Sequence, residues 1–318
     1  MRARFWGTRG SIPAALTSQE LRRKLVRALE AAIGRGLDST AKIEAFLDHE
    51  LDFSASHTFG GNSPCVELIT GGPELLVCDM GSGARPFGNQ VIARSAGTRP
   101  RINVFMSHLH WDHIMGFPFF APAYVPGAQI RIHGCHDSLE RAFRLQQSAP
   151  VFPVDFSRLA ACIEFVRLTP DEWSEVAGVR VKPMLQHHSG DSYGYRFEHD
   201  GRSVVYSTDS EHKLSDPAEA AAFADFFRDA DLVIFDAMYS LLDAISVKED
   251  WGHSSNVVAV ELAQLARVKH LCLFHHEPAN DDEQIAAILR DAIRLEQLTR
   301  TDHRVRVSAA WDGLEIET

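Results

Sequence analysis

The segment that most constrains this chain is Ser107–His113, with the sequence SHLHWDH, which directly follows the apolar run Ile102–Met106. In extended chain, residues two apart point the same way, so His108 and His110 can hold one ion together. Asp112 and His113 lie where the chain turns toward a helix, and we expect them to face a second ion. Imidazole suits zinc and similar metals, and a carboxylate adds negative charge. The segment therefore predicts a metal site at the end of a buried strand.

Three further segments end strand-like runs with side chains of the same kinds. They are Gln186–Ser189 (QHHS), Tyr206–Ser210 (YSTDS) and Phe274–Pro278 (FHHEP). Each one alone is typical of a cap or a hydrogen-bonded turn. Together with the first segment they predict ligands that converge on one edge of a sheet. At this point the doublets His187–His188 and His275–His276 leave open which histidine of each pair is the ligand.

The order of the remaining patterns predicts stacked sheets with helices outside. Strand-like runs lie at Cys65–Thr70, Leu75–Cys78, Ile102–Met106, Ile130–His133, Ile163–Leu168, Val179–Met184, Ser192–Glu198, Ser203–Ser207, Leu232–Phe235 and His270–Phe274. Helical patterns cover Pro217–Arg228, Asn256–Arg267 and Ile285–Leu298, with Ser254 or Ser255 as one N-cap and a capping box at Asn280-x-x-Glu283. We find no internal repeat and no linker, and expect a single domain over residues 1–318.

Residues 17–50 are predicted to form two helices that interrupt the strand-like pattern on either side. Thr17-x-x-Glu20 predicts a capping box, and Leu21, Leu25, Leu29 and Ile33 recur at helical spacing. The same helix carries basic residues at Arg22, Arg23, Lys24 and Arg27. Two interpretations follow: a helical hairpin packed on the surface, or a lid or dimer element beside a site that binds an anion.

Composition excludes several classes of protein. The 318 residues carry a net charge of -11, which argues against sequence-independent binding to long nucleic acid. No apolar run reaches the roughly 18 residues of a membrane span, and the first residues lack the apolar stretch of a signal peptide. The five scattered cysteines are expected to be buried, reduced thiols. We therefore expect a cytoplasmic protein that has no contact with a membrane.

The motifs together resemble the metallo-β-lactamase superfamily of metal-dependent hydrolases. The HxHxDH signature is present at His108–His113, and Asp79 lies in CDMGSG like the first motif of that superfamily. RGSIP at residues 9–13, FGGN at 59–62, YGYR at 193–196 and STDSE at 207–211 are most similar to its branch of cyclic phosphodiesterases. The resemblance covers nearly the whole chain. It implies an α/β fold, an αββα sandwich of two stacked mixed sheets flanked by helices, with the metals at one edge. Compared with that branch, this chain has a helical insertion at about residues 14–57.

The resemblance also implies a ligand set for two divalent metal ions, with zinc expected and manganese or iron as alternatives. His108, His110 and His188 would hold one ion, Asp112, His113 and His275 the other, and Asp209 would bridge them. His188 is chosen because its spacing to Tyr193 matches related enzymes, and His275 because it comes first after its strand. His187 and His276 would then have structural roles. Asp79 would fix the tautomer of a histidine ligand.

The expected reaction is hydrolysis of a small phosphodiester, a cyclic nucleotide or a sugar cyclic phosphate. With two cations and the carboxylates of Asp112 and Asp209 the site is net positive, and a metal-activated hydroxide would attack phosphorus. His253, in a glycine-flanked turn before a helix, is the candidate donor of a proton to the leaving oxygen. Asp236, Tyr239 and His212 are weaker candidates for lining the pocket.

Two other functions remain open. One is a tRNA 3′-end processing endonuclease, a neighbouring branch with the same ligands. The other is a weakly hydrolytic sensor that binds its ligand in the same fold, although the seven filled ligand positions argue against a decayed site. The insertion leaves the size of the substrate open, and a homodimer is possible.

Overall fold

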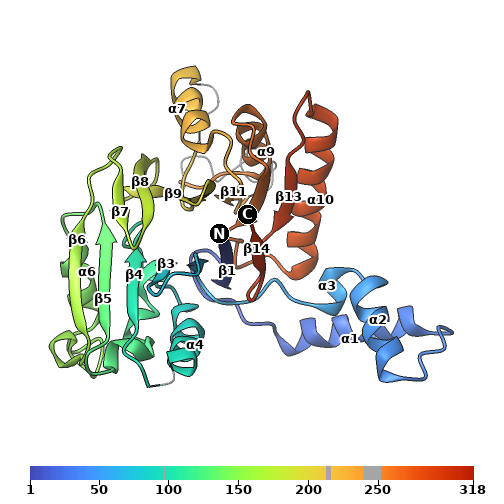
Figure 1. Ribbon diagram of the computed structural model, residues 1–318. Helices are drawn as coiled ribbons and strands as arrows, with labels where there is room; N and C mark the ends of the chain where they lie inside the picture. The colour runs from blue at the N-terminus through green and yellow to red at the C-terminus, as the bar shows by residue number, and fades with distance from the viewer. Residues whose placement is uncertain (96, 213–215, 240–251) are drawn as a thin grey trace.

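The computed structural model describes residues 1–95, 97–212, 216–239 and 252–318, which fold into two seven-stranded mixed sheets (Figure 1). The first sheet has the order β14 (Glu315–Glu317), β1 (Arg2–Gly7), β2 (Cys65–Ile69), β3 (Leu75–Cys78), β4 (Arg101–Phe105), β5 (Gln129–Gly134) and β6 (Cys162–Arg167). The second has the order β13 (Arg306–Ala309), β12 (His270–Phe274), β11 (Leu232–Asp236), β10 (Arg202–Ser207), β9 (Ser192–His199), β8 (Val179–Gln186) and β7 (Ser174–Val176).

Both sheets combine an antiparallel part with a parallel part. Strands β3 to β6 are parallel to one another in the first sheet, and strands β10 to β13 are parallel in the second. The carboxyl ends of neighbouring parallel strands lie at the same edge of a sheet. The segments that follow β3, β4, β10, β11 and β12 can therefore supply one site.

Three apolar layers hold the fold together. The layer between the sheets contains large rings from both of them, among them Phe5, Phe105, Tyr195 and Phe274. A second layer joins the outer face of the second sheet to α7 (Pro217–Phe227), α9 (Asn256–Leu265) and α10 (Asp282–Thr299). A third joins the first sheet to α4 (Ala84–Ser95) and α6 (Leu139–Gln146). Helices thus cover the outer faces of two packed sheets, which confirms the αββα sandwich.

Some local predictions were wrong. The capping box of α10 is formed by Asp281 and Gln284, one residue later than expected, because the Asp281 carboxylate accepts from the Gln284 backbone N–H. Helix α9 begins after Ser255 as its N-cap but ends at Leu265, earlier than predicted. Cys162 is exposed, whereas the other cysteines are buried, and none of the five is in a disulfide.

The predicted helices near the N-terminus are α1 (Ser18–Ala32) and α2 (Thr40–His49), followed by the short α3 (Phe53–Ser56). The Thr17–Glu20 capping box is present. In Figure 1 the α1–α2 hairpin projects at the lower right, beyond α3 and the N-terminal end of α10. Arg23, Lys24 and Arg27 pair with Asp281, Asp282 and Glu283. These partners favour a docked surface hairpin over an anion site at the basic face.

Among the described residues, no helix combines the length and the apolar character that a membrane crossing requires.

Candidate metal centre

The HxHxDH segment lies at the end of β4, as its sequence predicts. His108 and His110 follow in extended chain, and α5 (Trp111–Ile114) begins with His110 as its N-cap residue. His108, Asp112 and His113 are buried, whereas His110 faces solvent. The turn into α5 carries Asp112 and His113 to a different side of the site from the first two histidines.

Asp79, at the end of β3, holds this segment in place. Its carboxylate accepts from the Ser107 backbone N–H at 2.8 Å and from the Ser107 hydroxyl at 2.7 Å. It also contacts His113 Nδ1 at 2.8 Å and accepts from the Tyr206 hydroxyl at 2.8 Å. With its Nδ1 held by a carboxylate, His113 presents Nε2 to the site. This is the orienting role expected for Asp79.

One group of ligand-type atoms consists of His108, His110 and His188, called the histidine set below. His188 Nε2 lies 3.1 Å from His110 Nδ1. His188 Nδ1 contacts the Gly252 carbonyl at 2.8 Å, so it carries the proton and Nε2 is the free nitrogen. Gly252 has φ of 81°, and a Cβ there would lie 2.5 Å from His188 Nδ1, so the close approach requires glycine.

The second group consists of Asp112, His113 and His275, called the mixed set, together with Asp209. Asp112 Oδ2 lies 3.3 Å from His113 Nε2 and 3.5 Å from His275 Nε2. The two imidazole nitrogens are 3.4 Å apart. Gly10 packs against His275, where a Cβ would lie 2.6 Å from Nδ1. The RGSIP segment therefore forms part of the wall beside the mixed set.

Asp209 lies between the two sets and faces both. Its Oδ1 is 3.2 Å from His113 Nε2 and 3.2 Å from His275 Nε2. Its Oδ2 is 3.6 Å from His108 Nε2 and 3.8 Å from His188 Nε2. One carboxylate oxygen thus points toward each set, which is the arrangement that a bridging ligand needs.

The two histidine doublets separate clearly. His188 and His275 point into the cluster, whereas His187 is exposed and lies 3.5 Å from Glu219. His276 is buried elsewhere, with Nε2 2.8 Å from the Ala310 carbonyl. Both doublets lie just after a strand, where the chain turns, and only one imidazole of each reaches the cluster.

The backbone is left-handed at three strand ends that build the site. Asp79, Asp209 and His275 have φ of 59°, 47° and 60°. Few residues other than glycine adopt this conformation, and such residues cluster at functional sites. The turn lets each strand end directly in a side chain aimed at the site.

Burial and charge act in opposite directions on the cluster. Burial lowers the pKa of His108, His110 and His188, with a further contribution from their imidazole neighbours at His108 and His110. Burial also acts to raise the pKa of Asp209, but His275, His113 and His108 outweigh it and hold that pKa well below its usual range. The histidine set is therefore neutral and Asp209 ionised at neutral pH, which are the forms that bind metal.

His253 lies beside both sets and is held by Asp236. His253 Nδ1 is 2.7 Å from Asp236 Oδ2, and Asp236 ends β11 fully buried. The His253 ring is 5.1 Å from the rings of His188 and His275. Burial acts to lower the pKa of His253, but the Asp236 carboxylate dominates and raises it to about 9.

Two of the weaker candidates join the site, and one does not. Asp236 is the partner of His253, and the Tyr239 ring lies 5.7 Å from the His253 ring. His212 packs instead among Phe223 and Phe235 in the outer apolar layer, so its proposed place in the pocket was wrong. The role of Asp236 as the partner of His253 was not predicted, although its position at the end of β11, which is parallel to β10 and β12, was a usable signal.

The donor set fits divalent cations. His108 Nε2 is buried and has no hydrogen-bond partner among the described residues, although its Nδ1 contacts the Ser107 hydroxyl. A buried nitrogen without a partner is costly unless another group occupies its lone pair. The imidazole nitrogens and carboxylate oxygens of each group lie within 4.8 Å of one another, and such atoms are ligands for zinc, manganese or iron.

A two-sheet sandwich with imidazoles and carboxylates at one edge defines a class of metal-binding hydrolase folds. The chain belongs to the β-lactamase superfamily of metallo-β-lactamase-fold hydrolases, since residues 78–276 match the profile of the β-lactamase superfamily domain. It is 22% identical over 272 residues to a ribonuclease Z of Bradyrhizobium diazoefficiens, which covers 71% of this chain and 87% of the relative.

Two solved structures share the fold over the whole chain. The metallo-β-lactamase fold protein YhfI from Bacillus subtilis superposes with a TM-score of 0.64 at 16% identity, covering 100% of this chain and 99% of that one. A diphosphatase of the PhnP family superposes with a TM-score of 0.60 at 19% identity, covering 100% and 97%. At these identities the likeness concerns the fold alone.

Proposed function

We propose that this chain is a dinuclear metal-dependent phosphodiesterase that hydrolyses a small phosphodiester, of the class of cyclic nucleotides or sugar cyclic phosphates. The observation that carries the proposal is the position of Asp209, with one carboxylate oxygen toward each of the two ligand sets. A bridging carboxylate between two cations suits a substrate whose negative charge is spread over several oxygens.

In this proposal the histidine set would hold one cation, the mixed set would hold the other, and Asp209 would contact both. Zinc is the expected metal, with manganese or iron as alternatives. When bound, two such cations polarise phosphoryl oxygens and lower the pKa of a water molecule to about 7. Asp112 and Asp209 offset only part of the positive charge, so the site attracts an anion.

His253 donates a proton to the leaving oxygen. Asp236 occupies Nδ1, which leaves the Nε2–H available to a substrate. Asp236 raises the pKa of His253, which favours the protonated ring that a general acid requires. Asp236 also fixes the ring orientation, so Asp236 is a positioning residue and His253 the catalytic one.

A second candidate is a tRNA 3′-end processing endonuclease. The ribonuclease Z relatives favour it, since they match about two thirds of the chain or more. The net charge of -11 weighs against a grip on a long polyanion. The basic face of α1 weighs against it too, because Arg23, Lys24 and Arg27 contact carboxylates of this chain.

Turnover assays separate the candidates. Metal-loaded protein would be incubated with bis(p-nitrophenyl) phosphate, with 2′,3′- and 3′,5′-cyclic mononucleotides, and with tRNA that carries a 3′ extension. The proposal predicts hydrolysis of a cyclic mononucleotide with a higher kcat/KM than cleavage of the tRNA. Efficient release of the 3′ extension would favour the endonuclease, and absence of turnover on every phosphodiester would favour a sensor.

A further inference from the structure

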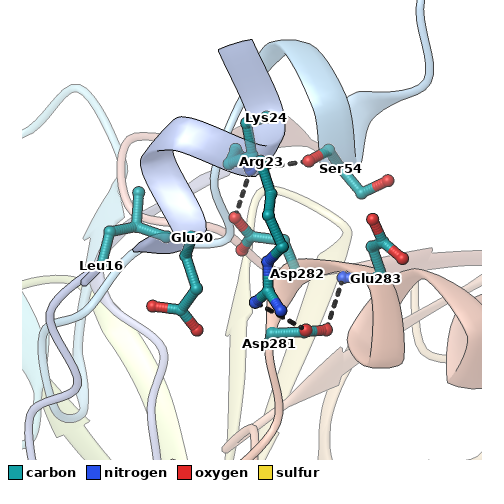
Figure 2. A pocket seen from close by; sticks show the side chains of 8 residues that line it. All are labelled: Leu16, Glu20, Arg23, Lys24, Ser54, Asp281, Asp282 and Glu283. Atoms are coloured by element: carbon teal, nitrogen blue, oxygen red, sulfur yellow. Dashed lines mark hydrogen bonds and ion pairs between the residues drawn. The ribbon is translucent and has the colours of Figure 1, made fainter. Parts of the chain in front are cut away.

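The helix α1 is docked with its polar face inward and its apolar face outward. An amphipathic helix ordinarily turns its apolar stripe to the core. Here none of the residues of α1 is buried. Figure 2 shows Arg23 and Lys24 of this helix directed at Asp281 and Asp282, on the body of the molecule.

The contacts between α1 and the body are ionic and partly buried. Lys24 Nζ donates to the carbonyls of Ser54 and His57 and pairs with Asp282. Asp282 in turn accepts from the Phe59 backbone N–H at 2.9 Å and from the Thr58 hydroxyl at 3.1 Å. These contacts fix the rotation of the helix about its axis, and therefore fix which face meets solvent.

The outward face is a continuous apolar stripe. At 3.6 residues per turn, Leu21, Leu25 and Leu29 share one side of the helix, opposite the docked cations. Leu25 is 55% exposed, Leu29 69% and Ile33 79%. Val26 on α1 and Ile43 on α2 are also exposed. Exposed apolar stripes of this kind mark interfaces.

We propose that this stripe is the interface with a second copy of the same chain, formed by antiparallel α1 helices across a two-fold axis near Val26. With a rise of 1.5 Å per residue, the leucines at 21, 25 and 29 of one copy alternate with those of the other about every 3 Å along the pair. The stripe therefore interdigitates with itself, which an isologous interface requires.

Charge supports the same register. Arg22 and Glu30 each lie four residues from Val26, so Arg22 of one copy is level with Glu30 of the other. The exposed apolar side chains amount to on the order of 600 Å² per copy, close to the roughly 800 Å² that each partner contributes to a stable complex. The ligand sets lie at the sheet edge and are not part of this surface.

Sedimentation equilibrium of the 318-residue chain tests the proposal. The wild type is expected to have twice the chain mass of 35.4 kDa at micromolar concentration. The double variant L25E/L29E is expected to be monomeric, with unchanged circular dichroism. The matched control is Leu298→Glu, at a position on α10 that is 74% exposed, and it is expected to remain dimeric.

A charge exchange tests the register. Arg22→Glu is expected to weaken the dimer by about tenfold or more, and the added Glu30→Arg is expected to restore it. A monomeric wild type, or a dimer that survives L25E/L29E, would overturn the proposal. So would a monomer that binds phosphatidylglycerol vesicles, because that result would assign the stripe to a lipid surface.

Discussion

The metal-ligand edge and the α1–α2 hairpin show two opposite uses of charged side chains. At the edge, carboxylates and imidazoles from strand ends of both sheets point at one another and form two sets of metal-ligand type. In the hairpin, cations and carboxylates are already paired within the chain, and the apolar side chains face outward. The first region gathers ligand-type side chains around one point, whereas the second uses its ion pairs to dock a helix on the rest of the chain.

The largest expected effect is at the centre of the ligand edge. Asp209→Asn removes the charge that faces both sets while keeping the shape of the side chain. We expect phosphodiester turnover to fall by on the order of 10³-fold or more, together with bound metal. Elemental analysis and turnover of bis(p-nitrophenyl) phosphate measure both, and a variant that keeps two metals and its activity would contradict the bridging role.

The histidine doublet offers a matched pair of variants. His188→Ala should lose metal from the histidine set and at least about 10²-fold of activity, whereas His187→Ala should change neither beyond about twofold. The two positions are adjacent in sequence, so the comparison removes general effects of the segment. Equal losses in both variants would mean that the assignment of His188 is wrong.

His253 should affect the chemical step rather than the metal content. His253→Gln is expected to lower kcat by about 10²- to 10⁴-fold with both metals retained. A proton donor works only in its protonated form, so wild-type kcat should decline as pH rises through the His253 pKa. Asp236 raises that pKa to about 9, and bound cations act to lower it, so the decline is expected at or below pH 9. The His253→Gln variant should lack this alkaline limb; its persistence would point to another donor.

A smaller effect is expected where Asp79 orients His113. Asp79→Asn removes the carboxylate from His113 Nδ1, and metal affinity should weaken by about 10- to 100-fold. Competition with a chromogenic chelator measures the affinity. Unchanged binding would show that the tautomer of His113 is fixed by other contacts.

The smallest expected effects are in the hairpin, and they concern stability rather than activity. Lys24→Met removes the hydrogen-bonded cation of the buried Asp282 and leaves it only Arg9, 4.0 Å away, so it should lower the free energy of unfolding by about 2–3 kcal/mol. Arg27→Ala breaks an exposed pair with Glu283 and should cost at most about 1 kcal/mol. Urea unfolding measures both, and turnover should stay unchanged. Equal costs would show that burial does not distinguish the two pairs.

The strands and the site motif could be predicted from the sequence because each depends on residues that are close together in the chain. Apolar runs such as His270–Phe274 ended at ligand-type residues, and the structure ends β12 there. Helix α4 was not predicted, since Pro86 and Gly88 obscure its pattern. Gly88 is needed because a Cβ there would lie 2.7 Å from the Phe120 ring, a constraint that only tertiary packing imposes.

What the sequence could not supply was the direction of side chains. Both members of each histidine doublet have the same chemistry, and the sequence separated His188 from His187 only through a spacing to Tyr193 that matches related enzymes. The leucine spacing in α1 predicted an amphipathic helix but not which face would meet the body. That choice depends on Asp281–Glu283, more than 250 residues away in the chain.

The most direct test of the account is anomalous diffraction at the zinc edge from crystals of the zinc-loaded protein. The account predicts two peaks about 3.5–4 Å apart, one contacted by His108, His110 and His188, the other by Asp112, His113 and His275, with Asp209 contacting both. A single peak, or peaks away from these side chains, would contradict it.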